Sequence, residues 1–490
     1  MRRLRVALCL VFVVLVGGCG DDPPKATGPA ALKYVPAGAD AVVVVPTDLD
    51  GEQLQRLEAL MQPVLRQDSE GDIHEFAASL FDGSDVNFAR DVEPLLGEDL
   101  VLAEWGSEDD PRVLAALETP DGTRAGEVAR RLDLEHRVDG DTLLISISGG
   151  AATLKPPGAS FDPAAFGDDE GPALVRLAGN PQLLVKELDV DVDLPWIQAL
   201  DGLSASIRLD DHAITAHAHL TTRPDDLSDG DLPLASGDDA PPAAEEDGAI
   251  SSGNRNQSQT TVFLAQLARK AWPDSDFVAE VELAEKDLGI SFEDEVLKQF
   301  NGPSASVAWP DGSFAALSDL DDPDRMRELL PKLAPRLPGI LSSLQSLGNK
   351  GLVALLLVAP DAPLVPGALP LLRQGDIGVR RLQGEDLYEL TGLNDDGNRF
   401  TVPRVVFGVR DDDRFVVASG LDQLRSVSDL EVSDVEGAHG AAVARTDFST
   451  WDTDPLGLEL VPLGKAVGEL EASREGIDAR LRVDVPGGLD

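Results

Sequence analysis

Residues 84–105 (SDVNFARDVEPLLGEDLVLAEW) and residues 288–309 (LGISFEDEVLKQFNGPSASVAW) are two versions of one sequence pattern. They align without a gap and place apolar residues at the same positions. Val86, Phe88, Val92, Leu96 and Trp105 match Ile290, Phe292, Val296, Phe300 and Trp309. The middle three of each set are spaced by four, which predicts a short amphipathic helix, and a strand leading to the tryptophan follows. Such a repeat indicates a duplicated structural unit.

The repeat continues toward the C-terminal side of each copy. Residues 112–118 resemble residues 313–319, and both read as strands that run into a helix. Asp121 and Asp322 lie near the N-termini of these helices, where a negative charge interacts favourably with the helix dipole. Gly140 with Asp141 in one copy, and Asp412 with Asp413 in the other, read as turns that open into a further strand.

Each copy closes with a pair of strands that reads as a hairpin. These pairs are residues 203–219 and residues 467–483, with predicted turns at Asp210-Asp211 and Glu475-Gly476. Strands that alternate polar and apolar residues, with a few helices between them, predict mainly antiparallel sheets covered on one face by helices. The expected fold class is therefore α+β, built as two tandem related modules.

Changes in composition suggest the domain boundaries. Residues 223–247 are rich in Asp, Pro, Ala and Gly and read as an acidic linker or long loop. The expected organisation is a lipoprotein signal peptide at 1–18, a flexible tether at 19–30, a first module at 31–222, this linker, and a second module at 248–490.

The second copy carries an apolar insert near residues 334–404. The offset between copies grows from 201 (Leu132 to Leu333) to 272 (Asp141 to Asp413), a difference of 272 − 201 = 71 residues. Residues 337–372 within it form the most apolar sequence beyond the N-terminal segment. We interpret the insert as a helix and a buried strand that fill a larger core; the alternatives are a hydrophobic ligand groove or a contact with the bilayer.

The N-terminal segment predicts export and lipid attachment. Arg2, Arg3 and Arg5 precede an apolar run at residues 6–16, and Val16-Gly17-Gly18-Cys19 follows. This arrangement resembles a bacterial lipobox. The resemblance implies that Cys19 becomes the first residue of the mature chain and carries a diacylglyceryl group on its thiol. The alternatives are a plain secretory signal or an uncleaved anchor, although the run is short for a membrane span.

Composition indicates a globular chain and argues against some partners. The chain has 490 residues, of which 42% are hydrophobic and 26% charged, enough for two to four domains. Its net charge of −47 becomes 38 − 88 = −50 without the three N-terminal arginines. This charge argues against binding nucleic acid or lying flat on an anionic membrane. Cys9 would leave with the signal, so no disulfide is expected.

Residues 31–45 (ALKYVPAGADAVVVV) open the body with a Val-Pro-Ala turn and a strand. Together with Leu95-Leu96-Gly97 and the step at residues 321–324 (DDPD), this stretch resembles an envelope family known as domain of unknown function 3352. The resemblance implies a secreted or anchored protein with duplicated modules. It carries no assigned activity, so it transfers no catalytic residue.

The sequence contains no complete motif for catalysis or nucleotide binding. Glycine-rich nucleotide loops and Cys-x-x-Cys pairs are absent. His74-Glu75 opens like a zinc-protease motif, but Ala78 stands where the second histidine is required. Ser304 and Ser306 follow Gly302 in a pattern that lacks the last glycine of a nucleophile elbow. We interpret both patterns as accidental.

Possible metal ligands are few. His217 and His219 are two apart on an expected strand and so share a face, with His212 across the turn, but the sequence shows no third ligand. Acidic residues at 189 and 191, at 319–324 and at 394–398 do not complete a calcium loop. We interpret these as solvated turns and a surface histidine pair, and expect no metal or cofactor.

These observations favour a non-enzymatic lipoprotein of the bacterial cell envelope. It would be held to the membrane through Cys19, face the extracytoplasmic side, and act as a binding or structural module for a protein or lipid partner. The first alternative is a carrier of a lipid-like ligand, which requires a continuous apolar cavity reaching the insert. The second is an envelope hydrolase that uses carboxylates gathered in a cleft.

Overall fold

The computed structural model describes residues 29–489, apart from several internal segments. These gaps are 69–71, 108, 168–170, 183–184, 186–191, 238–240, 245, 247, 344–376, 383–385, 394–398, 411, 430–431, 436–439 and 451–461. Cys19, most of the apolar insert, and the acidic residues at 189, 191 and 394–398 therefore lie outside the described residues.

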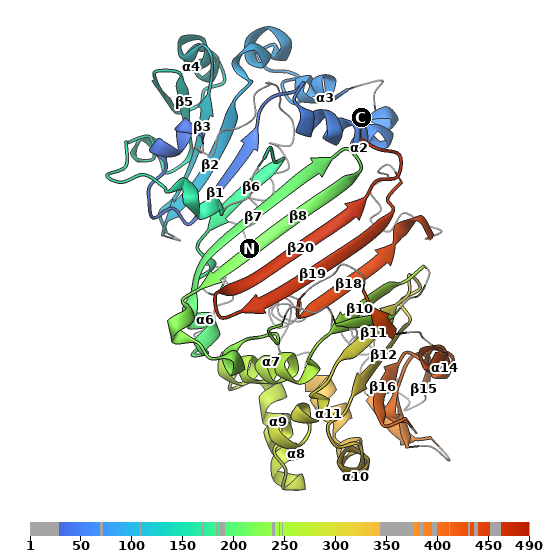
Figure 1. Cartoon of the computed structure of the whole chain (residues 1–490). Helices are drawn as coiled ribbons and strands as arrows, with labels where there is room; N and C mark the ends of the chain where they lie inside the picture. Colours follow the sequence, from blue (N-terminus) through green and yellow to red (C-terminus); the bar gives the residue numbers. More distant parts are fainter. Residues whose placement is uncertain are drawn as a thin grey trace.

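Eighteen strands of the described residues form one antiparallel sheet (Figure 1). Successive pairings place them in the order β4 (His136–Asp139), β5 (Thr142–Ser148), β3 (Pro111–Glu118), β2 (Asp99–Gly106), β1 (Ala41–Pro46), β6 (Val175–Gly179), β7 (Leu200–Asp210), β8 (Ala213–Thr222), β20 (Gly476–Asp484), β19 (Lys465–Ser473), β18 (Ala442–Asp447), β10 (Ile250–Asn254), β11 (Ser304–Ala308), β12 (Phe314–Asp319), β16 (Arg414–Ala418), β15 (Arg399–Val409), β14 (Leu387–Leu393) and β13 (Ile377–Arg381). Two short strands, β9 (Pro242–Ala244) and β17 (Val432–Asp434), pair separately.

Helices and short helical turns connect these strands. The longer ones are α2 (Glu52–Asp68), α3 (Ile73–Ser79), α4 (Gly122–Arg131), α6 (Pro195–Ala199), α7 (Gln257–Ala271), α8 (Asp276–Leu288), α9 (Phe292–Glu295), α10 (Pro323–Leu333), α11 (Leu337–Ser343) and α14 (Leu421–Asp429). The short turns are η1 (Ala30–Tyr34), η2 (Phe88–Val92), η3 (Glu93–Leu95), η4 (Gly150–Ala152), η5 (Pro163–Phe166), η6 (Pro224–Asp226), η7 (Asp229–Asp231), η8 (Leu297–Phe300) and η10 (Phe448–Thr450). The α+β fold class is confirmed.

The strands follow the same order in both directions from the β8–β20 pair. One direction runs β8, β7, β6, β1, β2, β3, β5 and β4, and the other runs β20, β19, β18, β10, β11, β12, β16 and β15. Strands β14 and β13, from the insert, extend the second side. The sheet is continuous across β8 and β20 (Figure 1), so the division into two modules stays a prediction.

The local details of the repeat are equivalent in the two halves. Asp121 caps α4 by accepting a hydrogen bond from the Arg124 amide at 3.0 Å, and Asp322 caps α10 through the Arg325 amide at 2.9 Å. Each cap satisfies a backbone donor that the first helical turn leaves free. The carboxylates predicted at these two helix starts therefore act as N-caps.

Two predicted boundaries differ from the structure. The helices expected from Phe88 and Phe292 break after one turn. The π-helical turn η2 is followed by the 3₁₀ turn η3, and the α-helical turn α9 is followed by the 3₁₀ turn η8. The hairpin turns consist of Asp211-His212 and Arg474-Glu475, one residue later and one earlier than predicted. Turn composition alone does not fix the strand register, since several polar residues adjoin each turn.

Helices cover one face of the sheet toward each side. Leu54, Leu57 and Leu60 of α2 pack in a core with Val43 of β1, and Leu329 of α10 packs with Phe314 of β12. Strand β1 is also covered on its other face, where η1 buries Leu32 against Val42 and Val44. The apolar run of β1 is unbroken, so side chains on both faces of this strand are buried. The sequence predicted helices on one face of the sheet only.

The linker and the insert are partly described. In residues 223–247, the side chains of Leu227, Leu232 and Leu234 are buried. In the insert, Ile340 of α11 packs with Val281 of α8. Within the part of the chain that the structure describes, no helix is long and apolar enough to cross a membrane.

Candidate binding sites

A carboxylate joins the two predicted histidines at the centre of the sheet. His219 on β8 lies opposite Asp478 on β20, and His217 lies opposite Arg480. His217 Nε2 and His219 Nδ1 donate to the two carboxylate oxygens of Asp478 at 2.5 and 2.8 Å. The two histidines share a face, as expected, whereas Asp478 is far away in sequence and only the strand pairing brings it close.

The surroundings of Asp478 in this histidine–aspartate cluster favour its charged form. Burial is the largest single influence on the Asp478 carboxyl and acts to raise its pKa, but the hydrogen bonds and charges of both histidines outweigh it and lower the pKa. Arg480 lies 3.8 Å from Asp478 and 3.4 Å from Glu471. Among the described residues, no group of three or more His, Cys, Asp or Glu side chains is arranged to hold a metal.

The opposite face of the same strands is apolar and open. Ile207, Ala216 and Leu481 are successive partners across β7, β8 and β20. Ile207 is 41% exposed and Leu481 45% exposed, although both lie in the middle of the sheet. Side chains alternate along a strand, so this central apolar row lies on the face opposite His217.

Among the described residues, helices cover this apolar face toward the two ends of the strands. At one end, α2 packs with Leu209 and Val483, and at the other, α6 and α7 pack with Leu220 and Ile477. Figure 1 shows β7, β8, β20 and β19 crossing the middle of the molecule with these helices beyond their ends. The central row is therefore a strip of apolar surface between two covered regions.

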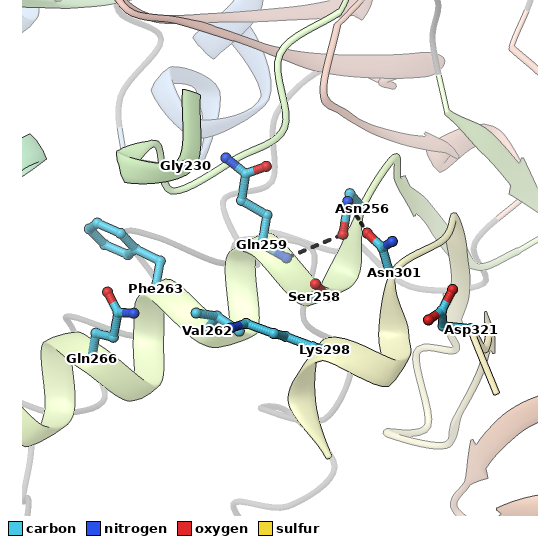
Figure 2. A pocket seen from close by; sticks show the side chains of 10 residues that line it. All are labelled: Gly230, Asn256, Ser258, Gln259, Val262, Phe263, Gln266, Lys298, Asn301 and Asp321. Carbon is cyan, nitrogen blue, oxygen red and sulfur yellow. Dashed lines mark hydrogen bonds between the residues drawn. The ribbon is translucent and has the colours of Figure 1, made fainter. Parts of the chain in front are cut away.

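A pocket of about 400 Å³ lies beside the first turns of α7 and is lined by polar side chains together with Val262 and Phe263 (Figure 2). Its walls come from α7, from η7, from η8 and from the loop after β12. Asn256 caps α7 by accepting from the Gln259 amide at 3.2 Å, and its own side-chain amide donates to Asn301 at 2.8 Å. These contacts fix the helix start that forms one wall.

Asp48 is a buried carboxyl between β1 and α2. It is 7% exposed, and neither carboxylate oxygen makes a hydrogen bond within the usual limits of distance and angle. Burial raises its pKa to about 6, assisted by the charges of Asp50 and Glu98 and opposed by nearby backbone amides. Such a group is a candidate for proton exchange, although it forms no hydrogen-bonded pair with a base.

The other residues that the sequence suggested as catalytic candidates make hydrogen bonds or ion pairs within the fold. The Ser306 hydroxyl is buried and lies 2.6 Å from the Ser252 hydroxyl across the β10–β11 pair, so it is not an exposed nucleophile. His74 lies 2.8 Å from Glu93 and 3.5 Å from Asp50. Burial acts to lower the pKa of His74, but Glu93 and two aspartates outweigh it and raise the pKa.

Comparison with known proteins gives one family match. Residues 4–142 match the family model described as "Protein of unknown function (DUF3352)". This match supports the resemblance to a family of unknown function for that part of the chain.

The other comparisons add no functional information. A solved structure described as "Structure of crystal form I of TP0453" is 13% identical, and the similarity covers 40% of this chain and 80% of that chain. Its TM-score of 0.22 is too low to carry an argument. Comparison with curated proteins gives no match.

Proposed function

We propose that the chain is a lipid-anchored protein of the bacterial cell envelope that binds a protein partner and does not catalyse a reaction. The observation that carries the proposal is the open apolar row of Ile207, Ala216 and Leu481 at the centre of the sheet. The anchor would be Cys19, and the partner would contact the sheet outside the membrane.

The start of the folded body supports attachment close to a membrane. Ala31, Leu32 and Val35 are almost fully buried, and the Ala31 amide donates to Glu118 at the end of β3 at 2.6 Å. Ala31 follows Cys19 by 12 positions in the sequence. A chain segment of that length spans at most about 40 Å. A lipid on Cys19 would therefore keep this end of β3 near the bilayer.

The exposed apolar row supports a binding role. Large apolar side chains at the middle of a sheet are normally covered, and contiguous exposed ones mark interaction surfaces. Here they occur in a chain with a net charge of −47, where most of the surface is expected to be strongly hydrated. The open and elongated strip suits the surface of another protein better than it suits an enclosed small molecule.

The engagement of the polar candidates supports a non-enzymatic role. Ser306 is bonded to Ser252 inside the sheet, and both histidines of the central cluster are bonded to Asp478. These contacts link neighbouring strands, and the Ser306 hydroxyl is buried within the sheet, where a substrate does not reach it.

Membrane attachment is tested by Cys19→Ser in a bacterial host that processes lipoproteins. We expect the unmodified chain to incorporate labelled fatty acid and to fractionate with membranes, and the variant to lose both properties while its body remains folded. Continued tight membrane association of the variant would contradict the lipid anchor.

Partner binding is tested by placing a photoreactive amino acid at position 207 or 481 and irradiating intact cells. We expect covalent adducts of discrete mass at both positions. The matched control is Leu283 of α8, which is 44% exposed and lies away from the row. Adducts at none of the positions, or equal adducts at position 283, would contradict the proposed surface.

A further inference from the structure

We infer that the pocket beside α7 binds a neutral polyhydroxylated molecule of about one sugar ring. This inference does not depend on the lipid anchor or on the central apolar row. It rests on the hydrogen-bonding groups that the pocket leaves unused.

Ser258 provides the first of these groups. It is the second residue of α7, is 8% exposed, and lines the pocket with its hydroxyl at the wall (Figure 2). A hydroxyl at the wall can both donate to and accept from a hydroxyl of a ligand.

Three further groups around the pocket have unused capacity. Asn301 accepts from Asn256 through its oxygen, which leaves its NH₂ group available as a donor. Gln266 donates to Glu293 at 3.1 Å, which leaves its carbonyl oxygen available as an acceptor. The exposed carboxylate of Asp321 lines the pocket and adds a second acceptor. The lining of the pocket therefore offers both donors and acceptors.

The mixture of donors and acceptors selects the class of ligand. A hydroxyl group both donates and accepts, so a ring carrying several hydroxyls can satisfy Ser258, Asn301 and Asp321 together. An apolar ligand would displace water from these groups without replacing its hydrogen bonds. The volume of about 400 Å³ is near the lower end of the range for small-molecule sites, which fits one ring.

Charge argues against an anionic ligand. Lys298 lines the pocket, but its ammonium lies 2.6 Å from Asp294 and 3.9 Å from Glu293, so its charge is compensated. Asp321 and the overall charge of −47 would repel an anion. The amide and hydroxyl groups are consequently the main recognition elements.

The test uses the purified full chain and three ring-sized probes in calorimetric titrations. The probes are glucose, glucose 6-phosphate and cyclohexanol. We expect glucose to bind saturably with a Kd of about 1 mM, and the other two to bind at least about tenfold more weakly. No saturation with glucose would overturn the inference, and so would tighter binding of glucose 6-phosphate or cyclohexanol.

Substitutions of the lining residues then test whether the sugar binds in this pocket. Ser258→Ala removes one neutral hydrogen bond, and Asp321→Asn replaces a charged acceptor by a weaker neutral one, so we expect each to lower the affinity about threefold to tenfold. Lys298→Gln should change the affinity by less than about twofold. Ser79→Ala, the same change on an exposed serine of α3, is the matched control and should have no effect.

The variants also give the outcomes that overturn the inference. Unchanged affinity in both Ser258→Ala and Asp321→Asn would locate the sugar elsewhere. Loss of binding in Lys298→Gln would indicate recognition by charge. Because Ser258→Ala removes a single oxygen atom from the pocket wall, its fold should persist, and Asn301→Ala at an exposed position provides a second variant.

Discussion

His217 on β8 lies directly opposite Arg480 on β20, and the strands of the sheet follow the same order outward from this pair. The junction between the two halves therefore lies within regular strand pairing and not in a loop. Backbone hydrogen bonds along nine paired residues, from Gly476 with Thr221 to Asp484 with Ala213, hold the halves together. The histidine–aspartate cluster adds side-chain contacts across the same junction.

We expect Asp478→Asn to destabilise the chain by about 1–2 kcal/mol at pH 7, because it weakens two charge-assisted hydrogen bonds across β8 and β20. The pKa of Asp478 is lowered in the folded state, so its contribution is present above the unfolded pKa of about 4 and is lost as the pH falls through the folded pKa. Urea unfolding at several pH values measures this dependence.

The matched control for Asp478 is Glu471→Gln on the neighbouring strand β19. Glu471 is a more exposed partner of Arg480 at 3.4 Å, and its replacement should cost less than about 0.5 kcal/mol. Equal losses from the two variants, or a loss from Asp478→Asn that does not shrink in acid, would contradict the role assigned to the cluster.

The sequence predicted the local elements of the fold better than their assembly. Matched phenylalanines, two capping aspartates and two hairpins were readable because each depends on residues close in sequence. The β8–β20 pairing was not, because alternating strands show which residues share a face but not which distant strand lies alongside. The continuous sheet could therefore not be predicted.

The same limit applies to the candidate sites. The spacing of His217 and His219 predicted a shared face, but Asp478 is 259 residues from His219 and carries no motif of its own. The pocket beside α7 combines Gly230, Ser258 and Asp321 from three separate segments. The exposure of Ile207 and Leu481 depends on where the helices end, which sequence periodicity does not determine.

Asp48→Asn should stabilise the chain above pH 7 by about 1–3 kcal/mol. The pKa of Asp48 is raised to about 6, so the folded state holds this proton more tightly than the unfolded state does. Stability of the unmodified chain should consequently fall as the pH rises from about 4 to about 6, and the variant should lack this fall. Unfolding by urea at pH 4 and pH 8 compares the two chains.

Asp82→Asn is the control for this titration, because Asp82 is an exposed aspartate in the same half of the molecule. Its replacement should change the stability by less than about 0.5 kcal/mol at either pH. If Asp48→Asn instead destabilised the chain at pH 8, the carboxylate would have a partner that offsets its burial.

Leu329→Ala should destabilise the second half of the sheet by about 2–5 kcal/mol, because Leu329 of α10 is fully buried against the sheet. Leu283→Ala provides the control at a side chain that is 44% exposed, and should cost less than about 1 kcal/mol. Calorimetric unfolding gives both values. A loss at Leu329 no larger than that at Leu283 would mean that α10 does not pack on the sheet as described.

The two N-caps give a direct comparison between the halves. Asp121→Ala and Asp322→Ala should each cost about 1 kcal/mol, since each removes the acceptor of one first-turn amide in α4 or α10. Asp121→Ser and Asp322→Ser should restore most of the loss, because serine also accepts this bond. The double alanine variant should show the sum of the single losses, as expected for distant sites. A loss at only one position, or no rescue by serine, would show that the matched aspartates do not act as equivalent caps.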